Sequence, residues 1–453
     1  MKFKVQVIEV DGDQEQVHEV LTVERDTLSF ETLGLSLAEG KALLGGVQNV
    51  FVRAQLAQHL EARRCCPQCG SRRGLKGHHR VLLHSLFGDL QLESPRLRRC
   101  PCENECGTFS PLAALLPDNT TPELLFLQVK WASLVSYGAT VGLLNDVLPM
   151  SETLNAETVR RHALRVATRG DEVLGEERVS FVDVCQRDID ALPAPDGPLI
   201  VGLDGGFVHS RGKGCFEVIA GKSILTFKCD EETDVPRSKG FAFVTTHDQK
   251  PRRRLFEHLR SQGMQLNQTV RFMSDGGDNV RNLGLHLHPA SEHMLDWFHV
   301  AMRFTVLGQF VKGLPKNLKL LGDASQRLER AKHHLWHGHV LEGHSILSEL
   351  EADVEAELFE REGDVTALKK FKRSLSDMVG YVGNNSTAMV NYGERYRAGE
   401  RISTGFVESA VNQIVSKRFV KKQSMRWSPK GAHLLLQIRT RVLNDELEGL
   451  FRR

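Results

Sequence analysis

The chain has 453 residues and a formal net charge of +2, and 41% of its residues are hydrophobic and 26% charged. This is the composition of an ordinary globular protein, and the length allows roughly two to four domains. No run approaches about 18 uncharged apolar residues, which argues against a membrane-spanning helix. The first residues, MKFKVQVIEVDGD, lack the apolar stretch of a signal peptide. We therefore expect a cytoplasmic protein whose nine cysteines are thiols or metal ligands rather than disulfides.

Residues 1–60 are predicted to form an N-terminal segment of one strand (FKVQVIEV) and a helix from about Ser36. A cysteine-rich unit follows at 61–116. Residues 61–100 contain nine Arg or Lys and three acidic residues, a surplus of six positive charges that suits a polyanion. A solvated charged face is the alternative.

The cysteines of this unit have metal-ligand spacing. Cys66 and Cys69 stand two residues apart in CPQC, so both thiolates can bind one ion in a tight turn. A hairpin with Gly88-Asp89 as its turn would bring them to the cysteines of RRCPCENECG. The alternative is a set of free buried thiols. We expect a structural Zn²⁺ held by Cys66, Cys69, Cys100 and Cys102, with Cys106 as a rival ligand.

Residues 117–190 are predicted to be helical. The helix AETVRRHALRVATR, capped by Asn155, follows another helix after a break, as in a helix-turn-helix unit. Its predicted DNA-binding residues are Arg160, Arg161 and Arg165. A helical connector with a charged outer face is the alternative. The proline-rich linker ALPAPDGP, 191–198, marks a domain boundary.

The remaining chain alternates strands and helices. Strands are expected near 199–209, 215–221, 241–246, 269–274 and 292–297, with helices at 252–262 and 279–286. Residues 298–400 are predicted to be helical, and a last helix is expected at 403–419. This order predicts a mixed α/β sheet whose two parts, 198–297 and 401–453, are separated by a helical insertion.

Three acidic residues occupy unusual places in this α/β region. Asp204 interrupts an apolar strand, Asp275 ends another, and both are followed by two glycines. Glu408 lies in the first turn of the last helix. Taken singly, each has a simpler interpretation. The aspartates could be turn residues, and the glutamate could be an acid that the helix dipole favours near the N-terminus. Together they are typical of a two-metal site for phosphodiester chemistry, with two Mg²⁺ ions on hard oxygen ligands.

The segment SKRFVKKQSMRWSPK, 416–430, contains six Arg or Lys and no acid. Such a cluster either binds the phosphate backbone of a nucleic acid or forms a solvated face of the protein. The residues predicted to contact DNA here are Lys417, Arg418, Lys421, Lys422 and Arg426.

Several motifs together resemble one family. GLDGGFVHSR, SDGGDNVRNL, HMLDWFHVAMRFTVLGQ and FVESAVNQIVSKRFVKKQSMRWSPKGAHLLLQIR are similar to motifs of bacterial insertion-sequence DDE transposases of the ISKra type. TFSPLAALLP and LLFLQVKWASLVSYG resemble the N-terminal half of the same group. The resemblance extends from about residue 60 to 440 and depends on the order and spacing of the motifs.

The resemblance implies a ribonuclease-H-like catalytic fold with a helical insertion before the glutamate, preceded by the zinc-binding and helix-turn-helix units. It implies that Asp204, Asp275 and Glu408 are the catalytic triad and the Mg²⁺ ligands. DWFH is similar to the C/D-x-x-H motif of related transposases, which implies a supporting role for Asp296 and His299.

The function we expect is that of a transposase in the bacterial cytoplasm, associated with the nucleoid. It would cleave DNA at the terminal inverted repeats of its own insertion sequence and join them to target DNA, acting as a homodimer or higher oligomer. Two alternatives stay open. A ribonuclease-H-like nuclease without strand transfer would share the acidic residues but would not need two DNA-reading units. A non-catalytic zinc and helix-turn-helix DNA-binding protein would need only residues 1–176.

Overall fold

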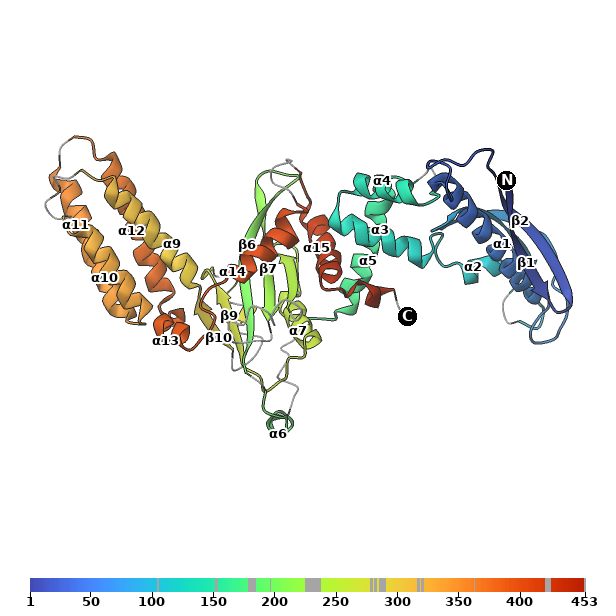
Figure 1. Cartoon of the computed structure of the whole chain (residues 1–453). Helices are drawn as coiled ribbons and strands as arrows, with labels where there is room; N and C mark the ends of the chain where they lie inside the picture. Colours follow the sequence, from blue (N-terminus) through green and yellow to red (C-terminus); the bar gives the residue numbers. More distant parts are fainter. Residues whose placement is uncertain are drawn as a thin grey trace. The chain divides into compact units, whose positions relative to one another are not determined.

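The computed structural model contains two compact units, Met1–Val166 with Leu447–Arg453, and Ala167–Glu446 (Figure 1). We call them unit 1 and unit 2. The structure describes the whole chain except residues 104–105, 151–153, 178–184, 196, 225–237, 278–279, 281–282, 285–290, 316–317, 319–321, 362, 420–424 and 452–453. The helix expected at 279–286 therefore lies mostly outside the described residues.

Unit 1 begins with an antiparallel hairpin and a long helix. The hairpin consists of β1 (Lys2–Asp11) and β2 (Gln14–Glu24). The helix α1 (Leu37–Arg63) starts where the sequence predicts, because Ser36 and Glu39 form a reciprocal capping box. None of the side chains of α1 is fully buried.

A three-stranded antiparallel sheet follows, with β3 (Leu75–Ser85), β4 (Gly88–Arg98) and β5 (Thr108–Phe109). Gly88 adopts φ +114° at the hairpin turn, a conformation that favours glycine. The short helix α2 (Pro111–Leu115) brings Leu112 into the core beneath this sheet.

Three longer helices complete the central part of unit 1: α3 (Pro122–Leu134), α4 (Tyr137–Val147) and α5 (Ala156–Val173). The two units divide between Val166 and Ala167, within α5, rather than at the linker 191–198. The last residues, from the 3₁₀ turn Leu447–Leu450 onward, belong to unit 1 and not to the catalytic core expected for 401–453.

Unit 2 is built on a five-stranded mixed sheet in the order β10-β9-β6-β7-β8. The strands β6, β7 and β8 form an antiparallel meander, and β9 and β10 run parallel to β6. Their bounds are β6 (Leu199–His209), β7 (Cys215–Ile224), β8 (Lys239–Val244), β9 (Val270–Ser274) and β10 (Glu292–Leu295).

Each face of this sheet packs against helices. On one face, Leu199 and Leu203 share a core with Leu255 of α7 (Pro251–Ser261). On the other face, α14 (Gly405–Val411) and the π-helical turn Asn412–Ser416 lie against β6 and β7 (Figure 1). The helix expected at 403–419 therefore changes its winding after Val411. α15 (Pro429–Leu443) packs on β8.

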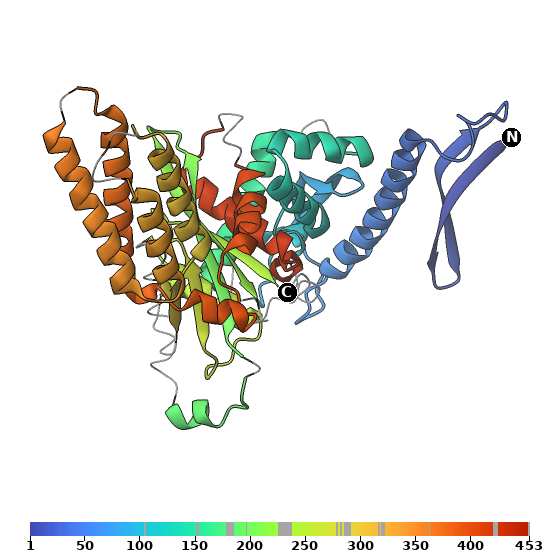
Figure 2. The same cartoon turned by 60° about the vertical axis from the view of Figure 1, so that its left-hand side comes forward.

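The expected helical insertion forms a block between β10 and α14 with its own apolar core. Its long helices α9 to α12 lie side by side (Figures 1 and 2). The bounds are α9 (Trp297–Lys312), α10 (Ala324–Trp336), α11 (Val340–Glu360), α12 (Thr366–Asn384) and α13 (Tyr392–Arg397).

Candidate functional sites

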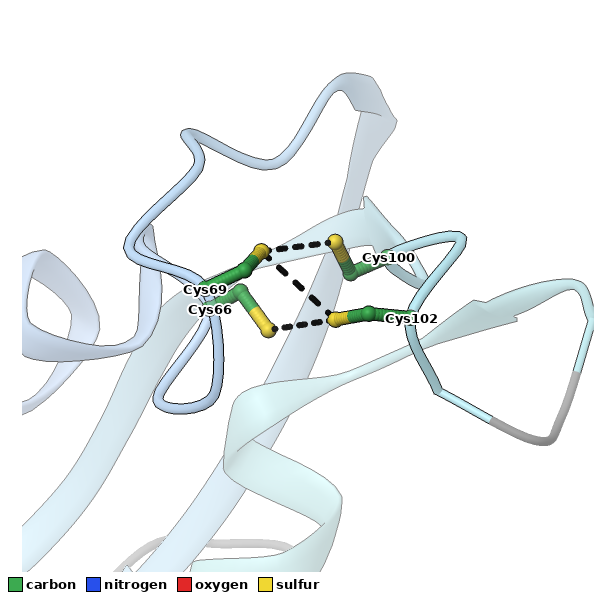
Figure 3. Close-up of side chains that lie close together, drawn as sticks. All are labelled: Cys66, Cys69, Cys100 and Cys102. Atoms are coloured by element: carbon green, nitrogen blue, oxygen red, sulfur yellow. Dashed lines mark hydrogen bonds between the residues drawn. The ribbon is translucent and has the colours of Figure 1, made fainter.

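Four cysteines meet at the open end of the β3–β4 hairpin (Figure 3). Cys66 and Cys69 lie between α1 and β3, and Cys100 and Cys102 follow β4. The Sγ atoms of Cys69 and Cys100 are 3.3 Å apart, and those of Cys66 and Cys102 3.4 Å. Zinc holds sulfur at about 2.3 Å, which separates tetrahedral ligands by about 3.8 Å. The cluster has the dimensions to hold one metal ion.

The chemistry of these cysteines also fits a cation. Hydrogen bonds from Ser71 lower the pKa of Cys69 to about 6, and the backbone N–H of Cys69 lowers the pKa of Cys66. The neighbouring thiols of Cys100, Cys66 and Cys69 raise the pKa of Cys102, because further negative charge beside them is unfavourable. A bound cation removes that penalty, since metal ligation requires thiolates.

A partly buried ion pair holds the turn that contains Cys100 and Cys102. Glu103 accepts a hydrogen bond from the Cys100 backbone N–H at 3.0 Å and pairs with Arg73. Cys106 is exposed and lies outside the cluster, as does Cys65. Of the two rivals for the fourth ligand, Cys102 is the one that the structure brings to the other three.

The aspartates predicted for catalysis are placed by two neighbouring parallel strands. β6 and β9 pair from Leu199 opposite Val270 to Gly202 opposite Met273. Continuing this register sets Asp204 across from Asp275, directly after β9 ends. Side chains alternate along a strand, so Asp204 shares the face of Gly202, on which α14 lies.

Glycines allow α14 to come close to this face. A Cβ atom on Gly202 would lie 2.0 Å from Val407 Cγ2, and one on Gly206 would lie 3.6 Å from Val411 Cγ1. Glu408 follows Val407 and is exposed. The glycines of the GLDGG stretch therefore seat the helix that carries the third predicted carboxylate against the strand that carries the first.

The charges of Asp275 and Glu408 both act on Asp204. Burial raises the pKa of Asp204, and the charges of Asp275 and Glu408 raise it further. The Gly205 backbone N–H and the charge of His299 act in the opposite direction. Asp275 is half-buried, and its Oδ1 accepts a hydrogen bond from the Gly277 N–H at 3.1 Å.

Asp296 and His299 lie at the same site. Asp296 is fully buried at the N-terminus of α9 and accepts hydrogen bonds from the Phe298 N–H at 2.8 Å and from the Thr404 hydroxyl. His299 Nδ1 lies 2.7 Å from Asp296 Oδ2, the same oxygen that accepts the hydrogen bond from Thr404. The bond to Asp296 raises the pKa of His299, and the charges of Asp275 and Asp204 act in the same direction. When it is protonated, the imidazole offsets part of the negative charge of the carboxylates.

The arginines of α5 do not form one open recognition surface. Arg160 pairs with Glu157 at 2.6 Å, and Arg165 pairs with Asp118 at 2.5 Å. Arg161 is exposed and, with Arg165, lines a cavity of about 580 Å³ between α5, α3 and the β3–β4 hairpin. Arg161 and Arg165 therefore face a concave wall of unit 1.

The basic residues after α14 differ in their exposure to solvent. Arg418 is buried and stacks over Trp427, with its Cζ 5.1 Å from the ring centroid, so its prediction as a phosphate contact does not match its position. Lys417 and Arg426 are exposed and stay candidates. Lys421 and Lys422 lie outside the described residues.

Sequence reasoning missed three contributors to the carboxylate site. Thr404 lies directly before α14, where a helix cap is common, but its bond to Asp296 is not visible in any local pattern. Tyr381 donates from its hydroxyl to the Asp275 carbonyl at 2.9 Å, and Arg303 lies over the Tyr381 ring. The separation of these residues along the chain hides both contacts.

No family model matches this sequence, and no curated protein is similar to it. Within the part of the chain that the structure describes, no helix combines the length and apolar character needed to cross a membrane.

Proposed function

We propose that this protein is a DDE transposase that cleaves DNA at the ends of its insertion sequence and joins them to target DNA. The observation that carries the proposal is the placement of Asp204 and Asp275 on adjacent parallel strands, with α14, which carries Glu408, packed on the face of β6 that Asp204 shares. The mixed five-stranded sheet and the helical block before α14 agree with the ribonuclease-H-like fold that the resemblance implies.

The carboxylate oxygens of these residues are ligands that Mg²⁺ prefers, and their mutual repulsion favours a bound cation. Two bound Mg²⁺ ions would activate water for strand cleavage and the resulting 3′-hydroxyl for joining. The protein's own task is to hold the three carboxylates in place. Asp296 fixes the ring of His299 beside them.

Unit 1 would recognise the terminal repeats. Three features support this role of unit 1. They are the basic cysteine-rich region, the four-cysteine cluster that would hold a structural Zn²⁺, and Arg161 at the wall of the cavity. We extend the proposal to a homodimer or higher oligomer on DNA, in the bacterial cytoplasm.

The first test replaces Asp204 or Asp275 by asparagine, or Glu408 by glutamine. These changes keep size and remove charge, so Mg²⁺-dependent cleavage and joining should fall by orders of magnitude while binding of end DNA is retained. Combining two changes should add little, because one lost ligand already disables a site that acts as a unit. Cleavage and joining are measured on labelled element-end DNA.

Glu446→Gln is the matched control, because Glu446 pairs with Lys239 on β8, in the same unit but outside the carboxylate site. A Glu408→Gln protein as active as this control would remove Glu408 from the site. Cleavage without joining would instead favour a nuclease. End binding without any metal-dependent cleavage would favour a non-catalytic DNA-binding protein.

A further inference from the structure

The helical block contacts the carboxylate site through the loop that carries Asp275. Tyr381, near the end of α12, donates its hydroxyl hydrogen to the Asp275 carbonyl oxygen at 2.9 Å. Asn385, one turn further on, is buried and covers Gly276, where a Cβ atom would lie 2.5 Å from Asn385 Oδ1. Gly276 has φ +90°, so the loop turns sharply beneath the end of α12.

Arg303 joins the same contact from α9. Its Cζ lies 4.0 Å from the centroid of the Tyr381 ring, close enough for a strong cation–π contact. Arg303 is exposed and follows His299 by one helical turn, so both project from the same side of α9. Within the described residues, no carboxylate forms an ion pair with Arg303.

A cation beside the acids would favour the approach of DNA. Asp204, Asp275 and Glu408 concentrate negative charge where a DNA strand, itself negative, must approach. A guanidinium carries a planar fork of N–H donors, which can bind a phosphate through two hydrogen bonds.

We propose that Tyr381 is a positioning residue for Asp275, and that Arg303, held on the Tyr381 ring, binds a backbone phosphate of the DNA strand at the carboxylates. This inference rests on the proposed function and extends it, because it makes the helical block a part of the catalytic centre. The Tyr381 hydroxyl fixes the backbone from which the Asp275 carboxylate projects, and Arg303 fixes the strand against it.

Tyr381→Phe tests the positioning role, because it removes the hydroxyl and keeps the ring under Arg303. The expected result is a cleavage rate lowered about ten-fold at saturating DNA, which corresponds to one lost hydrogen bond of about 1.4 kcal/mol. The Mn²⁺ affinity of the DNA-free protein, measured by electron paramagnetic resonance, should also fall, while the affinity for end DNA stays within two-fold. Tyr396→Phe, an exposed tyrosine of the same block, is the control.

Arg303→Gln tests the phosphate contact. We expect weaker binding of end DNA and a salt dependence of binding that is shallower by about 0.9 in log–log slope, the value for one phosphate contact. Arg303→Lys keeps the positive charge, so it should keep the wild-type slope but bind less tightly, since lysine has no planar fork of donors. Arg330→Gln, an exposed arginine on α10, is the control.

The outcomes separate this inference from the function on which it rests. A wild-type protein that binds no Mn²⁺ through Asp204 and cleaves no end DNA overturns both. A wild-type protein that cleaves, with Tyr381→Phe equal to Tyr396→Phe in rate and Mn²⁺ affinity, overturns the positioning role alone. Arg303→Gln with the salt slope of Arg330→Gln overturns the phosphate contact. The melting temperatures of Tyr381→Phe and Arg303→Gln should match that of the wild type.

Discussion

At the scale of single residues, burial separates the acids of unit 2 into two kinds. Asp296 is fully buried, and its oxygens face the Phe298 N–H, the Thr404 hydroxyl and the His299 ring. A buried carboxylate that is surrounded by donors orients its neighbours and has little freedom to ligate an ion. Asp204 and Asp275 are only half-buried. Asp296 therefore supports the site, and Asp204 and Asp275 are the better candidates for metal ligands because they are more accessible.

A second buried titratable residue predicts how unit 1 responds to acid. Burial lowers the pKa of His162 to about 4, and the charges of Arg165 and Arg161 contribute. In the unfolded chain its pKa is about 6.5, so the unfolded state binds the proton first as the pH falls. The free energy of unfolding of unit 1 should fall between about pH 6.5 and pH 4.

Urea denaturation at pH 7 and pH 5 measures this loss for the wild type and for His162→Gln. The variant keeps a polar partner for Gln128, which lies 2.6 Å from the His162 ring, but has nothing to protonate. Its stability should change less between the two pH values. An equal change in both proteins would mean that other histidines account for the acid sensitivity.

At the scale of elements, the contact of α14 with β6 shows what a sequence can and cannot predict. The apolar runs predicted the strands, and the acid followed by two glycines marked Asp204 and Asp275 as unusual. Glycine allows another group to approach the backbone closely. At Gly206, and at Gly202 before the acid, that group is α14 itself. The partner of a glycine depends on tertiary packing, which no local pattern contains.

Gly202→Ala tests this packing. The new methyl group would collide with Val407 Cγ2 and the Phe406 ring, so α14 must move and carry Glu408 away from Asp204. We expect a loss of about 1–3 kcal/mol in the free energy of unfolding, typical of overpacking, and a large loss of cleavage.

Gly308→Ala is the control, because Gly308 lies within α9 with open space around its Cα. Alanine there should stabilise the helix by about 0.5–1 kcal/mol. Differential scanning calorimetry and the cleavage assay compare the two variants. If Gly202→Ala cleaves as well as Gly308→Ala, the position of α14 does not control the site.

At the scale of the whole molecule, the division into units was only partly predictable. Prolines at 191–198 favoured a boundary there, yet Asp171 of α5 lies 2.6 Å from the buried Arg254 and belongs to unit 2. The C-terminal residues join unit 1, where Phe451 packs edge-on against Phe126 at 5.4 Å. Both contacts connect residues far apart in sequence. The four-cysteine cluster was more predictable, because ligand spacing is local and only the choice between Cys102 and Cys106 needed three dimensions.

The last prediction follows from this division. The four cysteines lie in unit 1, and metal binding contributes directly to the folding of small thiolate sites. Removal of zinc by a strong chelator should therefore lower the melting temperature of unit 1 and leave that of unit 2 unchanged. Cys66→Ser should have the same effect, whereas Cys106→Ser, outside the cluster, should leave both transitions in place. Calorimetry with metal analysis of the purified protein measures this. A chelated protein with both transitions unchanged, or a purified protein free of zinc that melts normally, would contradict a structural metal, because the chain would then hold these thiols together without a cation.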